Sequence, residues 1–413
     1  MKRSRYLLLA LVITCFSCEN DINVDSSGCR TKWFEVYGTP AHEYGNAVCM
    51  TPDEGYIVCG QIDNFDTNEE RLYVIRTGCN GNIIWEKTYS CAADGNAIRA
   101  LAGGGFIIYG RTGAYDLCLV EIDDNGNEIW SKSYNQYNMD FGMDDCLEIS
   151  SDNGFIMAGR AINVRDEIVV IKTDEEGNEE WRELVKSENY EYRSSGIVEI
   201  ADGYLVAGQQ RELPWDTFRS RICLIKINHE GTTVWIKDYE PVSTQYAEDI
   251  LLTADNEIYI LATEGIGGNV SHPNMVLKKV NADGDEAWTK MFDSYMLPTH
   301  RGVIASSLTT GRPGNLLLLG NTNEEQDILV IETDSEGNEL NKRSFGVKNF
   351  FITPEAIVIN GNDYGNAIIS TPRSGCLITG FTSAFGAGCA DVFLLKLNVK
   401  LQGEYNADVI PEE

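Results

Sequence analysis

The chain has 413 residues, of which 43% are hydrophobic, and its 63 Asp and Glu against 33 Lys and Arg give a formal net charge of −30. This hydrophobic fraction supports a folded core and excludes a disordered acidic chain. The acidic balance argues against a nucleic-acid-binding protein, which needs a basic surface to displace counterions, and it disfavours direct adsorption to anionic lipid.

The N-terminus has the features of a secretory signal peptide. Residues 1–5 carry three basic side chains, and residues 6–16 form an apolar run that is too short to span a bilayer. The small residue Ser17 then precedes Cys18. A basic start, a short apolar core and a small residue at the end predict a signal peptide over residues 1–17.

The end of this segment resembles the lipobox of bacterial lipoproteins, although Cys15 stands where the family usually has Leu. The resemblance implies that Cys18 is the lipidated first residue of the mature chain, anchored in the outer membrane, and that residues 18–30 form a tether. Ordinary secretion with cleavage elsewhere is the alternative. Glu19 resembles the surface-export signal of lipoproteins from Bacteroidetes-type bacteria, so we expect the cell surface, with the periplasmic face as the alternative.

The cysteines after Cys18 form neither a CxxC pair nor a metal-finger pattern. Cys118 and Cys223 lie in apolar strand runs, where cysteine behaves as a small core residue. A disulfide is compatible with an exported protein, but the sequence alone assigns no pairing.

The remainder of the chain is built from one repeat. Six of the seven tryptophans follow the same short Gly-containing pattern or stand in its slot, at intervals of 45 to 54 residues: Trp33, Trp85, Trp130, Trp181, Trp235 and Trp288. A degenerate copy has Asn341 in this slot. A period near 50 residues is the size of one four-stranded propeller blade.

Two further strand signals recur with the same period. A short apolar run bounded by turn residues occurs seven times, as in residues 55–60 and 105–110, and a second apolar run follows each of them, as in residues 72–77. Such runs favour buried strands, and no long segment has the helical period. The mature chain is therefore predicted to be all-β, with strands A to D in each repeat.

The two ends of the repeat region complement each other. The first Trp strand, residues 33–38, precedes every other strand, whereas the last copy ends after residues 391–398 without a Trp strand. We therefore predict a seven-bladed β-propeller over residues 31–400, closed by strand 33–38 joining the last blade, with residues 401–413 as a C-terminal tail.

The pattern of Asp123, Gly126, Asn127 and Trp130, together with the Gly-bounded strands, resembles the propeller repeats of exported bacterial proteins, many of them Bacteroidetes lipoproteins. The Gly-to-Trp spacing is also that of the tryptophan-docking (PQQ-like) repeats of quinoprotein dehydrogenases. The resemblance covers about residues 30–400 and implies the fold, but propellers host unrelated activities, so it implies no function.

Long irregular loops are confined to one predicted face. The A–B turns are short, whereas the B–C and D–A loops vary widely, as in residues 209–220, 264–274, 344–363 and 382–390. Irregular loops on a regular frame usually carry recognition, so we place the ligand site on this face.

The candidate ligand-binding residues lie at the predicted channel mouth or in its loops. They are Tyr44, Arg111, Phe141, Arg160, Tyr192, Trp215, Tyr246, His300 and Tyr364. Asp94 stands at the start of strand A in the second blade, and Gln61, Gln209 and Asn321 follow strand B like the two arginines. Aromatic, Arg and amide groups suit a sugar or an extended peptide. The alternative is that the tyrosines brace each blade and that Trp215 only anchors its loop.

Sharper chemistry is not supported by any motif. The Asp123–Glu128 segment does not fit a calcium loop and recurs at Asp174 and Asp334, which marks it as a C–D hairpin turn. No short-range pattern links His42, His272 and His300 into a metal site, and no nucleophile motif occurs. We assign no catalytic residue, metal or cofactor, although the many carboxylates leave a glycosidase pair open.

These observations favour a non-enzymatic binding module, an envelope lipoprotein that recognises a glycan or a protein on its loop-rich face. Two alternatives remain. One is a scaffold on the periplasmic side of an envelope complex, like the propeller lipoprotein of the outer-membrane assembly machinery. The other is a propeller glycoside hydrolase or lyase.

Overall fold

The computed structural model describes residues 24, 28–64, 69–134, 138–140, 146–162, 166–213, 220–239, 243–265, 272–292, 302–322, 326–346, 350–352, 357–359, 362–372, 375–384 and 386–401. The signal peptide and most of the tether expected from the sequence lie outside these residues. Within them the regular elements are strands, and no helix is long and apolar enough to cross a membrane.

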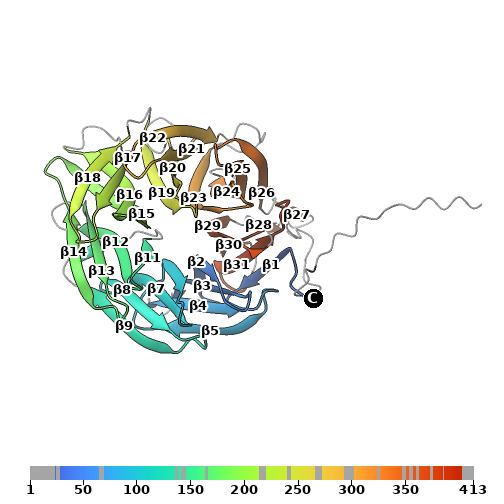
Figure 1. The fold of residues 1–413 in the computed structure, drawn as a ribbon. Coiled ribbons are helices and arrows are strands. Elements are labelled where there is room, and N and C mark those ends of the chain that lie inside the picture. Colours follow the sequence, from blue (N-terminus) through green and yellow to red (C-terminus); the bar gives the residue numbers. More distant parts are fainter. Residues whose placement is uncertain are drawn as a thin grey trace, which may run out of the picture.

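Seven antiparallel blades surround a central axis, which confirms the predicted seven-bladed β-propeller (Figure 1). In each blade strand A lies nearest the axis and strand D lies outermost. Blade 1 comprises β2 (His42–Met50), β3 (Tyr56–Asn64), β4 (Glu69–Thr77) and β5 (Ile83–Tyr89). Blade 2 comprises β6 (Ala97–Ala100), β7 (Phe106–Arg111), β8 (Leu117–Ile122) and β9 (Glu128–Tyr134). Blade 3 comprises β10 (Asn138–Asp140), β11 (Leu147–Ile149), β12 (Phe155–Ile162), β13 (Asp166–Thr173) and β14 (Glu179–Val185).

The remaining strands continue the same order. Blade 4 comprises β15 (Tyr190–Ile200), β16 (Gly203–Glu212), β17 (Ser220–Ile227) and β18 (Thr233–Asp238). Blade 5 comprises β19 (Gln245–Leu252), β20 (Ile258–Glu264), β21 (Asn274–Val280) and β22 (Glu286–Phe292). Blade 6 comprises β23 (Val303–Thr310), β24 (Asn315–Thr322), β25 (Ile328–Asp334) and β26 (Glu339–Phe345). A hairpin of β27 (Phe350–Ile352) and β28 (Ile357–Ile359) precedes blade 7, which comprises β29 (Asp363–Ser370), β30 (Cys376–Thr382), β31 (Asp391–Leu397) and β1 (Trp33–Tyr37).

The hydrophobic core lies between blades. Strands B and C are buried on both faces, as in β7, where every residue is buried. One buried cluster joins Ile57 and Val74 of blade 1 to Ile98 and Phe106 of blade 2. Because each blade buries its apolar side chains against its neighbour, no blade has a complete core of its own.

A tryptophan and a glycine meet at six of the seven seams between blades. Each repeat Trp lies on the glycine of the next blade's C–D turn, so that a Cβ added to Gly126 would come within 2.7 Å of the Trp85 ring. Equivalent contacts pair Gly81 with Trp33, Gly177 with Trp130, Gly231 with Trp181, Gly284 with Trp235 and Gly337 with Trp288. All six glycines also have positive φ, which side chains disfavour. The Gly-to-Trp spacing therefore encodes contacts between neighbouring blades.

Hydrogen bonds reinforce these seams. The indole nitrogen of Trp85 donates to the carbonyl of Asp124 at 3.1 Å. Tyr89, at the end of the same strand, donates its hydroxyl to the carbonyl of Gly126 at 2.8 Å. Tyr134 makes the equivalent bond to Gly177 at 2.9 Å. At these seams hydrogen bonds to the turn of the next blade thus accompany the packed indole ring.

The seam between blades 6 and 7 is built differently. Asn341 occupies the Trp slot, and its amide donates to the carbonyl of Lys400 at 3.3 Å. Leu401 stands where the other turns have glycine, with a φ of 54°, and its side chain is buried. This seam thus has a larger residue in the turn and no indole ring packed against it.

Strand β1 closes the ring as the sequence predicts, because all five of its residues pair with β31, from Trp33↔Lys396 to Tyr37↔Val392. A disulfide that the sequence could not assign joins Cys29 to Cys79 in the C–D turn of blade 1. Trp33 is fully buried, and its indole nitrogen donates to the carbonyl of Cys79 at 3.2 Å. The segment that completes blade 7 is therefore covalently held to blade 1.

The acidic segments that begin at Asp123, Asp174 and Asp334 are C–D hairpin turns, as the sequence predicts. The carboxylate of Asp123 accepts the backbone N–H groups of Asn125 and Asn127 at 2.9 and 2.7 Å, and the Asn127 side chain donates to it at 2.8 Å. These bonds lower the pKa of Asp123. Asp174 and Asp334 make the same bonds, so these carboxylates serve turn geometry.

We predict that Trp130→Ala lowers the free energy of unfolding by roughly 3 kcal/mol, because it empties the space against Gly177. The neighbouring Ile129 is 56% exposed, so Ile129→Ala should cost less than about 0.5 kcal/mol. Urea denaturation of both variants measures the difference. Equal losses in the two variants would contradict the packing role of the indole.

Candidate functional site

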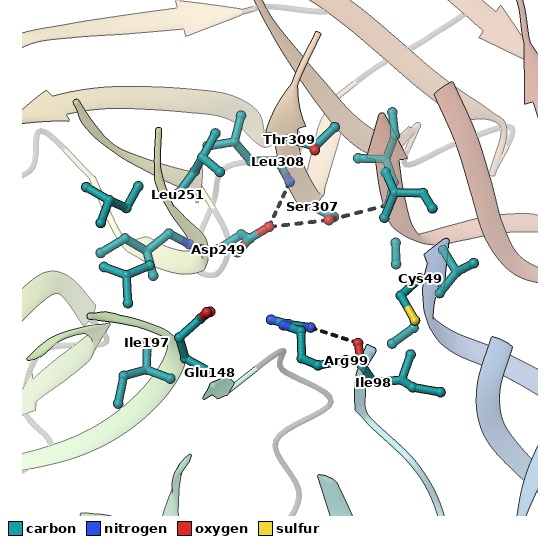
Figure 2. A pocket seen from close by; sticks show the side chains of 18 of the residues that line it. Cys49, Ile98, Arg99, Glu148, Ile197, Asp249, Leu251, Ser307, Leu308 and Thr309 are labelled. Atoms are coloured by element: carbon teal, nitrogen blue, oxygen red, sulfur yellow. Dashed lines mark hydrogen bonds between the residues drawn. The ribbon is translucent and has the colours of Figure 1, made fainter. Parts of the chain in front are cut away.

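The A strands line a central channel with a cavity of about 450 Å³ (Figure 2). Its wall is mainly aliphatic, with Arg99, Glu148 and Asp249 among the charged side chains. Asp249 accepts the backbone N–H of Leu308 at 2.7 Å, and Arg99 donates to the carbonyl of Leu147 at 2.8 Å. These two groups therefore tie neighbouring A strands together across the blade seams.

Polar side chains, among them Asn46 and Asn366, line a second, smaller cavity next to this wall, where the A strands bulge. The pairing of β2 with β3 skips Asn46, and that of β29 with β30 skips Asn366. The side chain of Asn366 donates to the carbonyl of Gly45 at 3.0 Å, and that of Asn46 to the carbonyl of Gly95 at 3.1 Å. The triplet Gly-Asn-Ala recurs at residues 45–47, 95–97 and 365–367, a signal that the sequence interpretation did not use.

At the end of strands A and B that leads towards the long loops, residues of the two strands face each other in pairs. In each pair, the strand A residue lies two positions before the bulged residue, and the strand B residue follows that strand's Gly or Ala. The pairs are Tyr44↔Gln61, Arg193↔Gln209, Tyr246↔Thr263, Ile304↔Asn321 and Tyr364↔Phe381. Of the residues predicted to follow strand B, Gln61, Gln209 and Asn321 are in these pairs, and Phe381 takes the same position in blade 7.

In blade 4 the register differs from expectation by one residue. Arg193, not Tyr192, takes the position equivalent to Tyr44, and Tyr192 is only 4% exposed. Successive side chains of a strand point to opposite faces, so a shift of one residue exchanges the buried and the exposed member. Ile304 takes the equivalent position in blade 6, where the sequence predicts His300.

Three of the predicted site residues, Phe141, Trp215 and His300, lie outside the described residues, as does Cys18. Their roles stay predictions. Of the other candidates, Tyr44 and Tyr364 belong to an aromatic cluster and Arg111 and Arg160 to an arginine sector, whereas Tyr192 is buried and Tyr246 lines a separate small pocket.

The aromatic cluster consists of Tyr44, Tyr364 and Phe381, from blades 7 and 1. The rings of Tyr364 and Phe381 stack at 4.9 Å with an interplanar angle of 20°, and Tyr44 meets Phe381 edge-on at 5.0 Å. All three are partly exposed. Rings that only braced a core would be buried, so this cluster offers an aromatic surface to solvent beside the polar Gln61 and Asp63.

The arginine sector consists of Arg111, Arg160, Arg193 and Arg211, from blades 2 to 4. Arg111 is 6% exposed and pairs with Asp94 at 2.6 Å and Glu70 at 2.7 Å. Arg160 and Arg193 share Asp166, at 2.7 and 3.1 Å, and Arg211 pairs with Glu191 at 2.6 Å. Arg111 is therefore embedded in the fold, whereas Arg193 and Arg211 have side chains 44% and 39% exposed.

Two buried carboxyl groups lie at the seam beside the aromatic cluster. Glu43, next to Tyr44, is fully buried and accepts hydrogen bonds from Thr39, while its Oε2 has no hydrogen-bond partner among the described residues. Asp391 is also fully buried and accepts the backbone N–H groups of Ala387 and Gly388. Burial raises the pKa of both groups, and the Asp391 charge adds to the effect on Glu43.

We predict that Glu43→Gln stabilises the protein at pH 8 and that this advantage shrinks by pH 4. The pKa of Glu43 is higher in the folded than in the unfolded chain, so its contribution to stability is present at low pH and is lost as pH rises through the folded value. Urea denaturation at both pH values tests this, with Glu212→Gln as the exposed control. An advantage of the same size at pH 4 and pH 8 would contradict the burial argument.

The described residues contain no group of three or more His, Cys, Asp or Glu that could hold a metal ion. Their carboxyl groups with a raised pKa are Glu43, Asp94 and Asp391, each at most 5% exposed. In the described part of the chain, the carboxyl groups with a raised pKa thus lie beneath the surface.

Comparison with known proteins supports the fold alone. No protein-family model and no curated protein matches the chain. Among solved structures, the β-propeller domain of the trilobed protease from Pyrococcus furiosus matches with a TM-score of 0.50 and 12% identity, covering 90% of this chain and 98% of that one. That propeller is described as having an open velcro topology, whereas here β1 pairs with β31.

Weaker likenesses connect the chain to proteins of different kinds. A Bacteroides caccae protein of unknown function matches with a TM-score of 0.42 and 13% identity, covering 74% of this chain and 94% of that one. A Pseudomonas brassicacearum lignostilbene dioxygenase matches with a TM-score of 0.49 and 7% identity, covering 90% and 92%. The chain is a β-propeller, and its function has to be argued from its own residues.

Proposed function

We propose that the chain is a non-enzymatic binding module that recognises a glycan at the channel mouth on its loop-rich face. The observation that carries the proposal is the partly exposed aromatic cluster of Tyr44, Tyr364 and Phe381. A binding site typically combines such an apolar surface with a few polar groups that fix orientation.

The cluster has the composition that a sugar ring requires. Its stacked rings present an aromatic surface for the C–H face of a sugar, and the amide of Gln61 and carboxylate of Asp63 stand on the neighbouring strand for its hydroxyl groups. Glu43 and Asp391, the buried carboxyl groups beside the cluster, are too deep to reach a bound sugar, whereas a glycosidase needs two carboxyl groups that do.

We also propose that the chain is anchored by a lipid at Cys18. The N-terminal segment enters β1 at Trp33, on the side of the C–D turns, where Cys29 is bonded to Cys79. A tether from that side would leave the loop-rich face pointing away from the membrane. A disulfide also suits an exported protein.

Cys18→Ser should release the protein from the membrane fraction, and unchanged membrane retention would contradict the anchor.

A glycan array with the mature protein, scored for binding and for product, tests the proposed function. We expect binding without product, and Tyr364→Ala should weaken it at least about tenfold, or by about 1.4 kcal/mol, because it removes a stacked ring. Tyr115→Ala, which removes an exposed tyrosine outside the cluster, should leave the affinity unchanged.

No glycan binding would contradict the proposal and favour the scaffold alternative. Binding accompanied by cleavage would favour the glycoside hydrolase or lyase. Equal losses in Tyr364→Ala and Tyr115→Ala would contradict the location of the site at the aromatic cluster.

A further inference from the structure

A small pocket on the loop-rich face lies apart from the aromatic cluster, where blade 4 meets blade 5. Its volume is about 50 Å³, room for one small group rather than a sugar ring. It is lined by Glu191, Arg193, Gln209, Arg211, Ser220 and Tyr246. These residues come from β15, β16, β17 and β19, and therefore from the rigid frame rather than from the loops.

The exposed charge of this pocket is positive. The Arg193 side chain is 44% exposed, but Asp166, its partner, is 10% exposed. Arg211 and its partner Glu191 show the same asymmetry, at 39% and 8%. Although Glu191 lines the pocket, both carboxylates are largely covered while their guanidinium partners face solvent, so the exposed charge is positive on a chain whose net charge is −30.

The pocket also retains hydrogen-bonding capacity. Arg193 directs Nε and Nη2 towards Asp166, each at 3.1 Å, and a guanidinium carries five N–H donors. The buried Oε1 of Gln209, which faces Arg193 across the strands, has no hydrogen-bond partner among the described residues. A buried polar atom without a partner is costly, and Gln209, which lines the pocket, would gain one if its side chain turned towards a ligand hydroxyl.

We propose that this pocket binds the carboxylate or sulfate group of an acidic glycan, with Arg193 as its principal donor. The inference rests on the proposed function and narrows its substrate class from glycans to acidic glycans. The planar fork of arginine matches a two-oxygen acceptor, and charge-assisted hydrogen bonds are about twice as strong as neutral ones. Tyr246 would pack against the sugar that carries the acidic group.

Paired probes separate this inference from the proposed function. The probes are an oligogalacturonate and its methyl ester, and a heparin oligosaccharide and its desulfated, carboxyl-reduced form, each measured by calorimetry at 50 and 300 mM salt. We expect at least one acidic probe to bind about tenfold or more tightly than its neutralised form, with an affinity that falls as salt rises.

Variants then locate the effect. Arg193→Gln should weaken the charged probe about tenfold and leave the neutral probe unchanged, while Asp166 keeps its two bonds to Arg160. Arg193→Lys should retain part of the preference for charge, because it keeps the cation but loses the planar fork. Arg343→Gln, an exposed arginine on β26, is the control for net charge and should have no effect.

Two outcomes would overturn the inference in distinguishable ways. Equal binding of charged and neutral probes, or equal effects of Arg193→Gln and Arg343→Gln, would contradict the acidic-group pocket and leave the glycan-binding function standing. If no probe binds and the glycan array is also silent, the proposed function fails and the acidic-group pocket fails with it.

Discussion

The contact of an indole ring with a glycine turn in the next blade holds this propeller together. At six seams the ring lies where any side chain on the glycine would have to be, so the two residues specify each other. The hydrophobic clusters also run across seams, and a blade separated from its neighbours would expose both faces of its central strands. The stability of every blade therefore depends on closure of the ring.

Closure is concentrated at the seam between blades 7 and 1. Strand β1 comes from the N-terminus, pairs with β31, and is linked through Cys29 to blade 1. A cross-link closing a loop of about 50 residues limits the freedom of the unfolded chain by roughly 4 kcal/mol in the entropic model. The aromatic cluster and the hydrogen bond from Asn366 to Gly45 lie at the same seam. The seam that carries this disulfide is thus also the one that presents the proposed ligand surface.

The sequence was sufficient to predict the blade number, the Trp slots and the closing strand, because each rests on periodic apolar runs and on turns that need glycine. The mouth was predicted less well. Bulges in the A strands change the alternation of side chains, and nothing in the residues around Tyr192 signals that Arg193 faces the mouth instead. The Cys29–Cys79 pair could not be chosen among many pairings. Phe381 could have been found, since it follows a strand B glycine as Gln61 and Arg111 do.

The local positive charge around Arg193 and Arg211 could not be predicted from the sequence for a related reason. Composition gives a strongly acidic chain, but it does not say which member of an ion pair is exposed. The structure withdraws Asp166 and Glu191 and leaves Arg193 and Arg211 facing solvent. This arrangement depends on tertiary packing, and it turns an acidic protein into one with a local basic pocket.

Hydrogen exchange on a chain lacking residues 29–38 tests the dependence on closure most directly. The deletion removes Trp33, the paired strand β1 and the disulfide, so the account predicts that amides in all seven blades lose protection together. Deletion of residues 402–413 is the matched control and should preserve protection. Blades 2 to 5 that stay protected while only blade 7 exchanges would contradict the claim that each blade depends on a closed ring.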